Sequence, residues 1–129
     1  MKYASRSYDS QNLDLKHISN LALGFFKEEG FVTQRFEKSN EHIIQARKGG
    51  ILRALLSTSR AITVVLNAHN NTIAAYMGVS EWIDGSEDER KRMIGLSIEK
   101  LFLETQESLW AYEIEHHLWN HLETNIEIS

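Results

Sequence analysis

Apolar and polar side chains alternate twice between residues 61 and 79, with a short break between the two runs. The apolar positions are Ile62, Val64 and Leu66 in the first run and Ile73, Ala75, Met77 and Val79 in the second. A period of two with many β-branched residues is typical of half-buried strands. Asn70 and Asn71, which lie in the break, tolerate the backbone geometry of a tight turn. The pattern predicts an antiparallel hairpin over 61–79.

A second alternating pattern predicts another hairpin, with strands at 31–38 and 42–47 and a turn at 39–41. Residues 51–60 join the two hairpins and carry leucines at helical spacing, which favours one or two helical turns. A strand is the alternative there, because so short a segment does not let the period decide. The two hairpins together predict a four-stranded antiparallel sheet.

A helix over residues 13–29 is predicted before the sheet. Asn12 or Asp14 can cap its first turn, and Gly30 can end it by taking a left-handed conformation. Residues three and four positions apart form one apolar stripe along it: Ile18, Leu21, Ala22 and Phe25. The stripe predicts that this helix packs on the sheet.

A second helical segment, residues 86–124, starts with Ser86 and Glu89 at the spacing of a capping box. As one straight helix it would be roughly 55 Å long, whereas a chain of this size has a radius of gyration of about 14 Å. Either the helix splits near 104–108, or part of it protrudes. Apolar residues recur along the segment and need cover from the sheet or from a second copy of the chain: Ile94, Ile98, Leu101, Tyr112, Trp119 and Leu122.

These elements predict an α+β fold in a single domain over 1–129. We expect a four-stranded antiparallel sheet with an N-terminal helix and a long C-terminal helix packed on one face. Residues 1–11 are expected to form a flexible arm, residues 13–82 the helix-plus-sheet core, and residues 86–124 the C-terminal helical region.

Composition narrows the class of protein. With 42% hydrophobic residues the chain can form a core, and without Cys it has no disulfide or thiolate chemistry, which is compatible with a cytoplasmic location. The formal net charge of −4 argues against bulk binding of polyanions. No apolar run is long enough for a transmembrane helix.

The stretch IIQARKGGILRALLSTSRAITVVL, followed by a turn and by Val-Ser-Glu-Trp, resembles a small uncharacterised bacterial domain. That domain has a strand ending in Gln-Ala-Arg-Lys, a small turn, a Leu-Arg-x-Leu-Leu segment, then Ser-Arg-Ala-Leu-Thr-Val and a Gly-x-x-x-Trp close. The resemblance covers residues 13–82 and implies no activity and no catalytic residue. Similar chains often continue into a glycine-rich hydrophobic tail, whereas residues 83–129 here are charged and predicted helical, which argues against a membrane role.

A basic group beside paired glycines is the first candidate site. Guanidinium groups and free backbone N–H groups at such a turn can receive a phosphate or a carboxylate. The residues are Arg47, Lys48, Gly49, Gly50, Arg53 and Arg60. The alternative is that these arginines pair with the chain's own carboxylates, such as those of Glu37, Glu41 and Glu81. No nucleotide-binding glycine motif is present.

The second candidate is a metal site on the C-terminal helix. Glu113, His117 and His121 lie four residues apart and share one helical face. Two imidazoles at this spacing and a carboxylate can ligate one metal ion. The alternative is that they are ordinary surface or interface histidines.

No nucleophile motif is present, and the carboxylates of residues 81–92 fall where a helix begins, so they complement the helix dipole. We therefore expect no enzymatic activity, no catalytic residue and no cofactor. Tyr76, Met77 and Trp82 could line an apolar pocket, or they fill the core.

The leading hypothesis is a non-catalytic interaction or regulatory module that self-associates through its C-terminal helix, as a homodimer. A binding module for a small anionic or apolar ligand at the basic group is the first alternative. A weak nucleic-acid binder that uses the same arginines is the second. A different protein partner also fits the leading hypothesis.

Overall fold

The computed structural model describes residues 2–9, 14–47, 60–104 and 108–128, and it describes side chains in all of these except 108–113 and 127–128. Lys48, Gly49, Gly50 and Arg53 therefore lie outside the described residues. The connector predicted at 51–60 lies almost wholly outside them as well.

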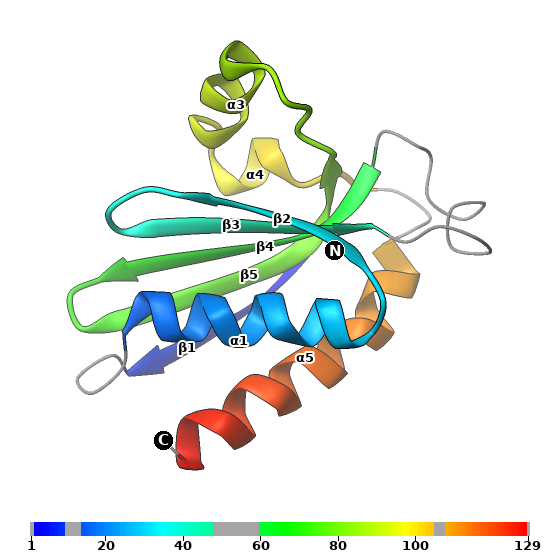
Figure 1. Ribbon diagram of the computed structural model, residues 1–129. Coiled ribbons are helices and arrows are strands. Elements are labelled where there is room, and N and C mark those ends of the chain that lie inside the picture. The colour runs from blue at the N-terminus through cyan, green and yellow to red at the C-terminus, as the bar shows by residue number, and fades with distance from the viewer. Residues whose placement is uncertain (1, 10–13, 48–59, 105–107, 129) are drawn as a thin grey trace.

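Five antiparallel strands form one sheet in the order β1-β5-β4-β3-β2 (Figure 1). The strands are β1 (Tyr3–Asp9), β2 (Val32–Glu37), β3 (Glu41–Arg47), β4 (Arg60–His69) and β5 (Thr72–Glu81). The two predicted hairpins are present as β2–β3 and β4–β5. Asn70 and Asn71 form the second turn with φ of 48° and 60°, the left-handed geometry that joins twisted strands with two residues.

The prediction of four strands was one strand short. Residues 3–9, expected within a flexible arm, form β1, which pairs with the distant strand β5 in the register Ala4↔Met77 and Tyr8↔Ile73. An edge strand buries only part of its surface, and here only Tyr3, Ala4 and Tyr8 supply apolar contacts with the buried cores on the two faces of the sheet. The remaining residues are polar, so local periodicity gives little sign of this strand.

Two helices cover one side of the sheet, which we call the helical face (Figure 1). They are α1 (Leu15–Glu28) and α5 (Ser108–Ile128). The Asp14 side chain accepts a hydrogen bond from the Lys16 backbone N–H, and Gly30 ends α1 with a φ of 86°, as the sequence predicts. The largest fully buried side chains here include Ile18, Phe26, Ile62, Leu66, Leu118, Trp119 and Leu122.

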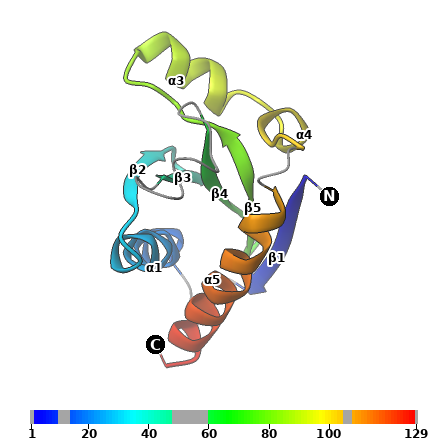
Figure 2. The same cartoon turned by 90° about the vertical axis from the view of Figure 1, so that its right-hand side faces the viewer.

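The second face of the sheet is covered at one end by a cap, residues 83–103, which contains α3 (Glu87–Ile94) and α4 (Ile98–Leu101). Figure 2 shows α3 and α4 at one end of the molecule, away from α1 and most of α5. A smaller core lies beneath the cap and buries Ile43, Val65, Ile83, Met93, Leu101 and Phe102. The predicted helical region is thus divided, and its parts pack on both faces of the sheet.

Local chemistry explains these divisions. Gly95 ends α3, and its backbone N–H donates to the Lys91 carbonyl at 3.2 Å. After α4, the Leu103 N–H donates to the Val79 carbonyl at 2.8 Å, so this part of the chain pairs with β5 instead of continuing as a helix. The split predicted near 104–108 falls between α4 and α5.

Candidate functional site

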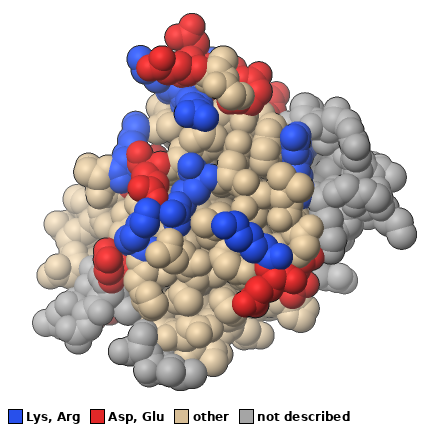
Figure 3. Space-filling model, in the orientation of Figure 1, with Lys and Arg blue, Asp and Glu red and all other residues tan. Residues whose placement is uncertain are grey.

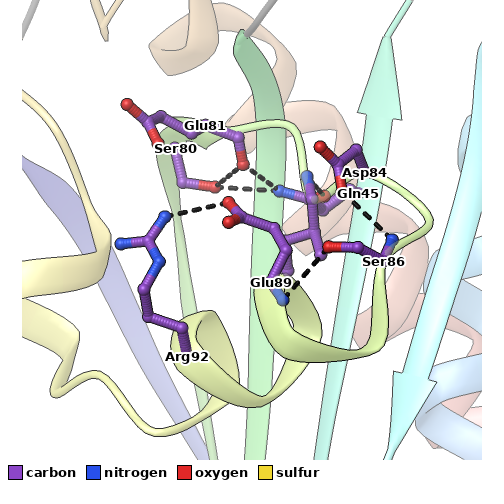
Figure 4. A network of polar contacts seen from close by, with 8 residues as sticks. Gln45, Ser80, Glu81, Asp84, Ser86, Glu89 and Arg92 are labelled. Atoms are coloured by element: carbon purple, nitrogen blue, oxygen red, sulfur yellow. Dashed lines mark hydrogen bonds and ion pairs between the residues drawn. The ribbon is translucent and has the colours of Figure 1, made fainter.

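The most densely hydrogen-bonded polar group of the second face is centred on Gln45 of β3, which is fully buried (Figure 4). Its side-chain oxygen accepts hydrogen bonds of 2.8 Å from Gln34 Nε2 and from the Ile83 backbone N–H. Its Nε2 lies 3.1 Å from Thr63 Oγ1, 3.0 Å from Ser80 Oγ and 2.8 Å from the Glu81 carbonyl oxygen. Strands β2 to β5 all contribute to this polar cluster.

The polar cluster holds the start of the cap on the sheet. Gln34 Nε2 also donates to the Ile83 carbonyl at 2.8 Å, so two glutamine side chains bind both backbone groups of one cap residue. Thr63 Oγ1 and Ser80 Oγ lie 2.5 Å apart and complete the cluster. Because these buried groups satisfy one another, the cluster is a structural device and leaves no free group for chemistry.

Three polar positions on the same face of the sheet form this cluster: two lie in the predicted strands, and Ser80 lies one residue beyond the predicted hairpin. Gln45, Thr63 and Ser80 interrupt otherwise apolar strands, and the register Gln45↔Thr63 places two of them side by side. The sequence alone does not show that they form a cluster, because their hydrogen-bond partners lie on other strands.

Ser86 caps the start of α3 as predicted, but the reciprocal contact of a capping box is made by Asp84 and not by Glu89 (Figure 4). Ser86 Oγ accepts a hydrogen bond of 3.2 Å from the Glu89 N–H, and Asp84 Oδ1 accepts one of 3.1 Å from the Ser86 N–H. The Glu89 side chain is paired with Arg92 at 2.9 Å. These carboxylates stabilise a helix start and are engaged within the cap.

The structure describes two members of the predicted anion site, Arg47 and Arg60. The Arg47 guanidinium lies 4.0 Å from the centre of the Trp82 ring, a cation–π contact. Arg60 is in register with Glu81 across β4 and β5. The two arginines therefore lie at the same end of the sheet, beside groups of the chain itself.

The three residues of the predicted metal site do not form a described cluster. The Glu113 side chain lies outside the described side chains, His117 is exposed, and His121 is half-buried with its ring 5.6 Å from that of Phe25. In the described part of the chain, no group of three His, Cys, Asp or Glu residues is arranged to hold a metal ion.

The residues predicted for the interface lie in two different cores. Trp119 and Leu122 are buried against α1 and the helical face, and Leu101 is buried beneath the cap. Ile94 and Ile98 are half-buried beside it, whereas the Tyr112 side chain lies outside the described set. Tyr76 and Met77 follow one another in β5 and point to opposite faces, so they cannot line one pocket.

Arg35 of β2 is neutralised within the chain. Its Nε lies 3.0 Å from Glu37 Oε1, and its Nη1 donates to Asn20 Oδ1 of α1 at 2.6 Å. Glu37 is also paired with Lys16, whose hydrogen bond holds the pKa of that carboxyl below its usual range. In Figure 3, Lys and Arg side chains are interleaved with Asp and Glu over this view, so no single-sign patch forms on it.

The end of the second face that the cap leaves open contains a shallow hollow of about 610 Å³. Amide, hydroxyl and aromatic side chains line it: Asn40, Asn67, His69, Asn70, Thr72, Ala74 and Tyr76. It lies at the opposite end of β4 from Arg60, so it is separate from the predicted anion site. Among the described residues no Lys or Arg lines it, which suits a neutral polar ligand better than an anion.

The outer strands of the sheet differ in chemistry. Within the described residues, β1 and β2 each pair with a strand on one side only. Val32 of β2 is 59% exposed and is the one large apolar side chain of the described set that faces solvent. An unpaired strand edge with an exposed apolar side chain is a template for another strand.

Comparison with known protein families, with curated proteins and with solved structures found no match for this chain. Within the described residues no helix combines the length and the apolar character needed to cross a membrane.

Proposed function

We propose that the chain is a non-catalytic interaction module that self-associates. The observation that carries this proposal is the sheet, whose two outer strands have no second partner strand among the described residues and whose β2 edge has an exposed Val32. The chemistry of the described interior supports it, because the polar cluster around Gln45 is internally satisfied. A backbone edge can recognise a partner without any catalytic group.

Self-association through the C-terminal helix, which the sequence favours, has less support than association through a sheet edge. Trp119 and Leu122 are already buried against the chain's own core. The exposed positions on the described part of α5 include His116, His117 and Asn120, which are polar. An interface there would have to form with little apolar surface or with the first turns of α5.

Light scattering coupled to size exclusion tests the proposal over a range from low to high micromolar concentration. We expect the mass to rise from that of one chain toward that of two, and the midpoint gives the dissociation constant. A single-chain mass throughout the range would refute self-association.

A second candidate function is binding of a small neutral polar ligand in the hollow on the second face. The aromatic ring of Tyr76 and the amides of Asn40 and Asn67 offer stacking and hydrogen bonding there. Titration of isotope-labelled protein with neutral monosaccharides should shift amide signals of Asn67, Thr72 and Tyr76 and leave those around Arg47 unchanged. Shifts around Arg47 on titration with phosphate would instead favour the anion site, and retention on a polyanion column that falls steeply with salt would favour nucleic acid.

A further inference from the structure

We propose that two copies of the chain pair through their β2 strands, antiparallel about a twofold axis at Gln34, and join their sheets into one. This inference rests on the proposed self-association and adds the surface, the partner and the register. Val32 of one copy then lies opposite Phe36 of the other, and Gln34 lies opposite Gln34.

The β2 edge suits this pairing better than the β1 edge. A charged side chain near the middle of the strand is one of the features that protect an edge strand from pairing. On β1 that residue is Arg6, whose side chain is 49% exposed and reaches Glu123 only at 3.8 Å. On β2 it is Arg35, whose side chain is 18% exposed. Because Arg35 is held against α1 and Glu37, the β2 edge lacks this protection.

The hydrogen-bond pattern of the β2–β3 hairpin defines which groups of β2 are free. The Lys38 N–H donates to the Glu41 carbonyl at 2.7 Å, and bonded and non-bonded pairs alternate along an antiparallel ladder. Phe36, Gln34 and Val32 are therefore bonded to β3. Thr33, Arg35 and Glu37 direct their N–H and C=O groups outward, toward the open edge.

Only certain registers let these outward groups bond to their counterparts on a second β2. With the axis at Gln34, Thr33 of each copy bonds with Arg35 of the other, and nearly the whole strand overlaps. With the axis at Arg35, Val32 faces Lys38, so the exposed Val32 side chain gains no apolar partner. Axes nearer either end of β2 leave only a short overlap. The axis at Gln34 is thus the register that overlaps nearly the whole strand and gives the exposed Val32 an apolar partner, Phe36.

The first experiment disrupts the pairing of the two β2 strands. Val32→Lys places a charge at the centre of the apolar pair, and we expect the dimer dissociation constant to rise about tenfold or more. The matched control is Ser5→Lys, which puts the same charge on the exposed β1 edge and should leave the dissociation constant unchanged. Circular dichroism and thermal melting confirm that both variants fold. A Val32→Lys variant that dimerises like the wild type would overturn the β2 edge but leave the proposed function intact.

The second experiment determines the register by disulfide cross-linking. Because the chain has no native Cys, only the introduced cysteines can form a disulfide. Val32→Cys and Phe36→Cys are made in separate chains. Directly opposite residues have Cα atoms about 4.5–5.5 Å apart, within disulfide range. Like residues would be roughly 13 Å apart, out of range. We expect a covalent dimer on oxidation of the mixture and none from either variant alone.

Cross-linking of Phe36→Cys by itself would place the axis at Phe36 and overturn the register. No cross-link in a mixture that light scattering shows to be dimeric would overturn pairing through β2. A wild-type chain that stays monomeric at every concentration would refute both this inference and the proposed self-association.

Discussion

Gln45 concentrates more hydrogen bonds than any other described side chain on the second face, and its removal should be costly. Gln45→Leu keeps a similar volume but leaves the Ile83 N–H and the hydroxyls of Thr63 and Ser80 with fewer partners. We expect a loss of about 2–3 kcal/mol in the free energy of unfolding, because buried polar groups would lose their partners. Urea denaturation measures it. Thr72→Ala, at an exposed position of β5, should stay within about 0.5 kcal/mol of the wild type, and an equal effect of both changes would contradict the structural role of Gln45.

His42 is 5% exposed, and its Nδ1 has no hydrogen-bond partner among the described residues. Burial lowers its pKa below the ordinary histidine value. The nearby cations Arg35 and Lys16 act in the same direction, whereas the carboxylates of Glu37 and Asp14 act against it. The folded chain therefore favours the neutral imidazole more than the unfolded chain does.

This difference predicts that stability falls on acidification. Neutral His42 makes its full contribution to the free energy of unfolding above the ordinary histidine pKa, near 6.5. This contribution is lost as the pH falls below that value, because the unfolded chain binds the proton more tightly than the folded chain does. We expect the free energy of unfolding to fall less between pH 7 and pH 5 in His42→Leu than in the wild type. His117→Gln, at an exposed position, should keep the wild-type slope. If the free energy of unfolding fell equally with pH in the wild type and in His42→Leu, His42 would not be the source of this pH dependence.

At the scale of elements, local pattern was enough for the two hairpins and for α1, where alternation and the Asp14 cap act within a few residues. It was not enough for β1, because an edge strand with only three residues in apolar contacts, Tyr3, Ala4 and Tyr8, depends on a partner far away in the chain. The candidate sites show the same limit: Arg47 and Trp82 lie far apart in sequence, and only the fold brings them into contact.

Gly78 shows how β1, β5 and the cap meet. A Cβ atom at this position would lie 2.6 Å from the Lys2 carbonyl oxygen and 2.7 Å from Cδ1 of Phe102. We expect Gly78→Ala to cost about 1–3 kcal/mol, because the Phe102 ring and the start of β1 would have to shift. Gly24→Ala in α1 is the control, because its Cβ would meet nothing within 4 Å and alanine favours the helix by about 1 kcal/mol. The melting temperature should fall for Gly78→Ala and rise for Gly24→Ala. A higher melting temperature for Gly78→Ala would show that this close approach is absent.

At the scale of the whole molecule, the sheet separates two cores of unequal size. The larger lies under α1 and α5 and contains Trp119. The smaller lies under the cap and contains Met93. The sequence identified the apolar residues of the C-terminal region, but it could not divide them between the two faces, because that depends on which face of the sheet α3, α4 and α5 each pack against.

Unequal cores predict unequal local stability. Native-state hydrogen exchange should show amides of α3 and α4 opening at a lower free energy than those of β4, because fewer buried side chains hold the cap. Met93→Ala should lower that local opening energy, by about 2–5 kcal/mol if the site does not collapse, with a smaller effect on β4. Trp119→Ala should instead lower the global free energy of unfolding by about 3–5 kcal/mol and speed exchange in β4. If cap and β4 amides exchanged with one common free energy, the polar cluster around Gln45 would couple the two cores into a single cooperative unit.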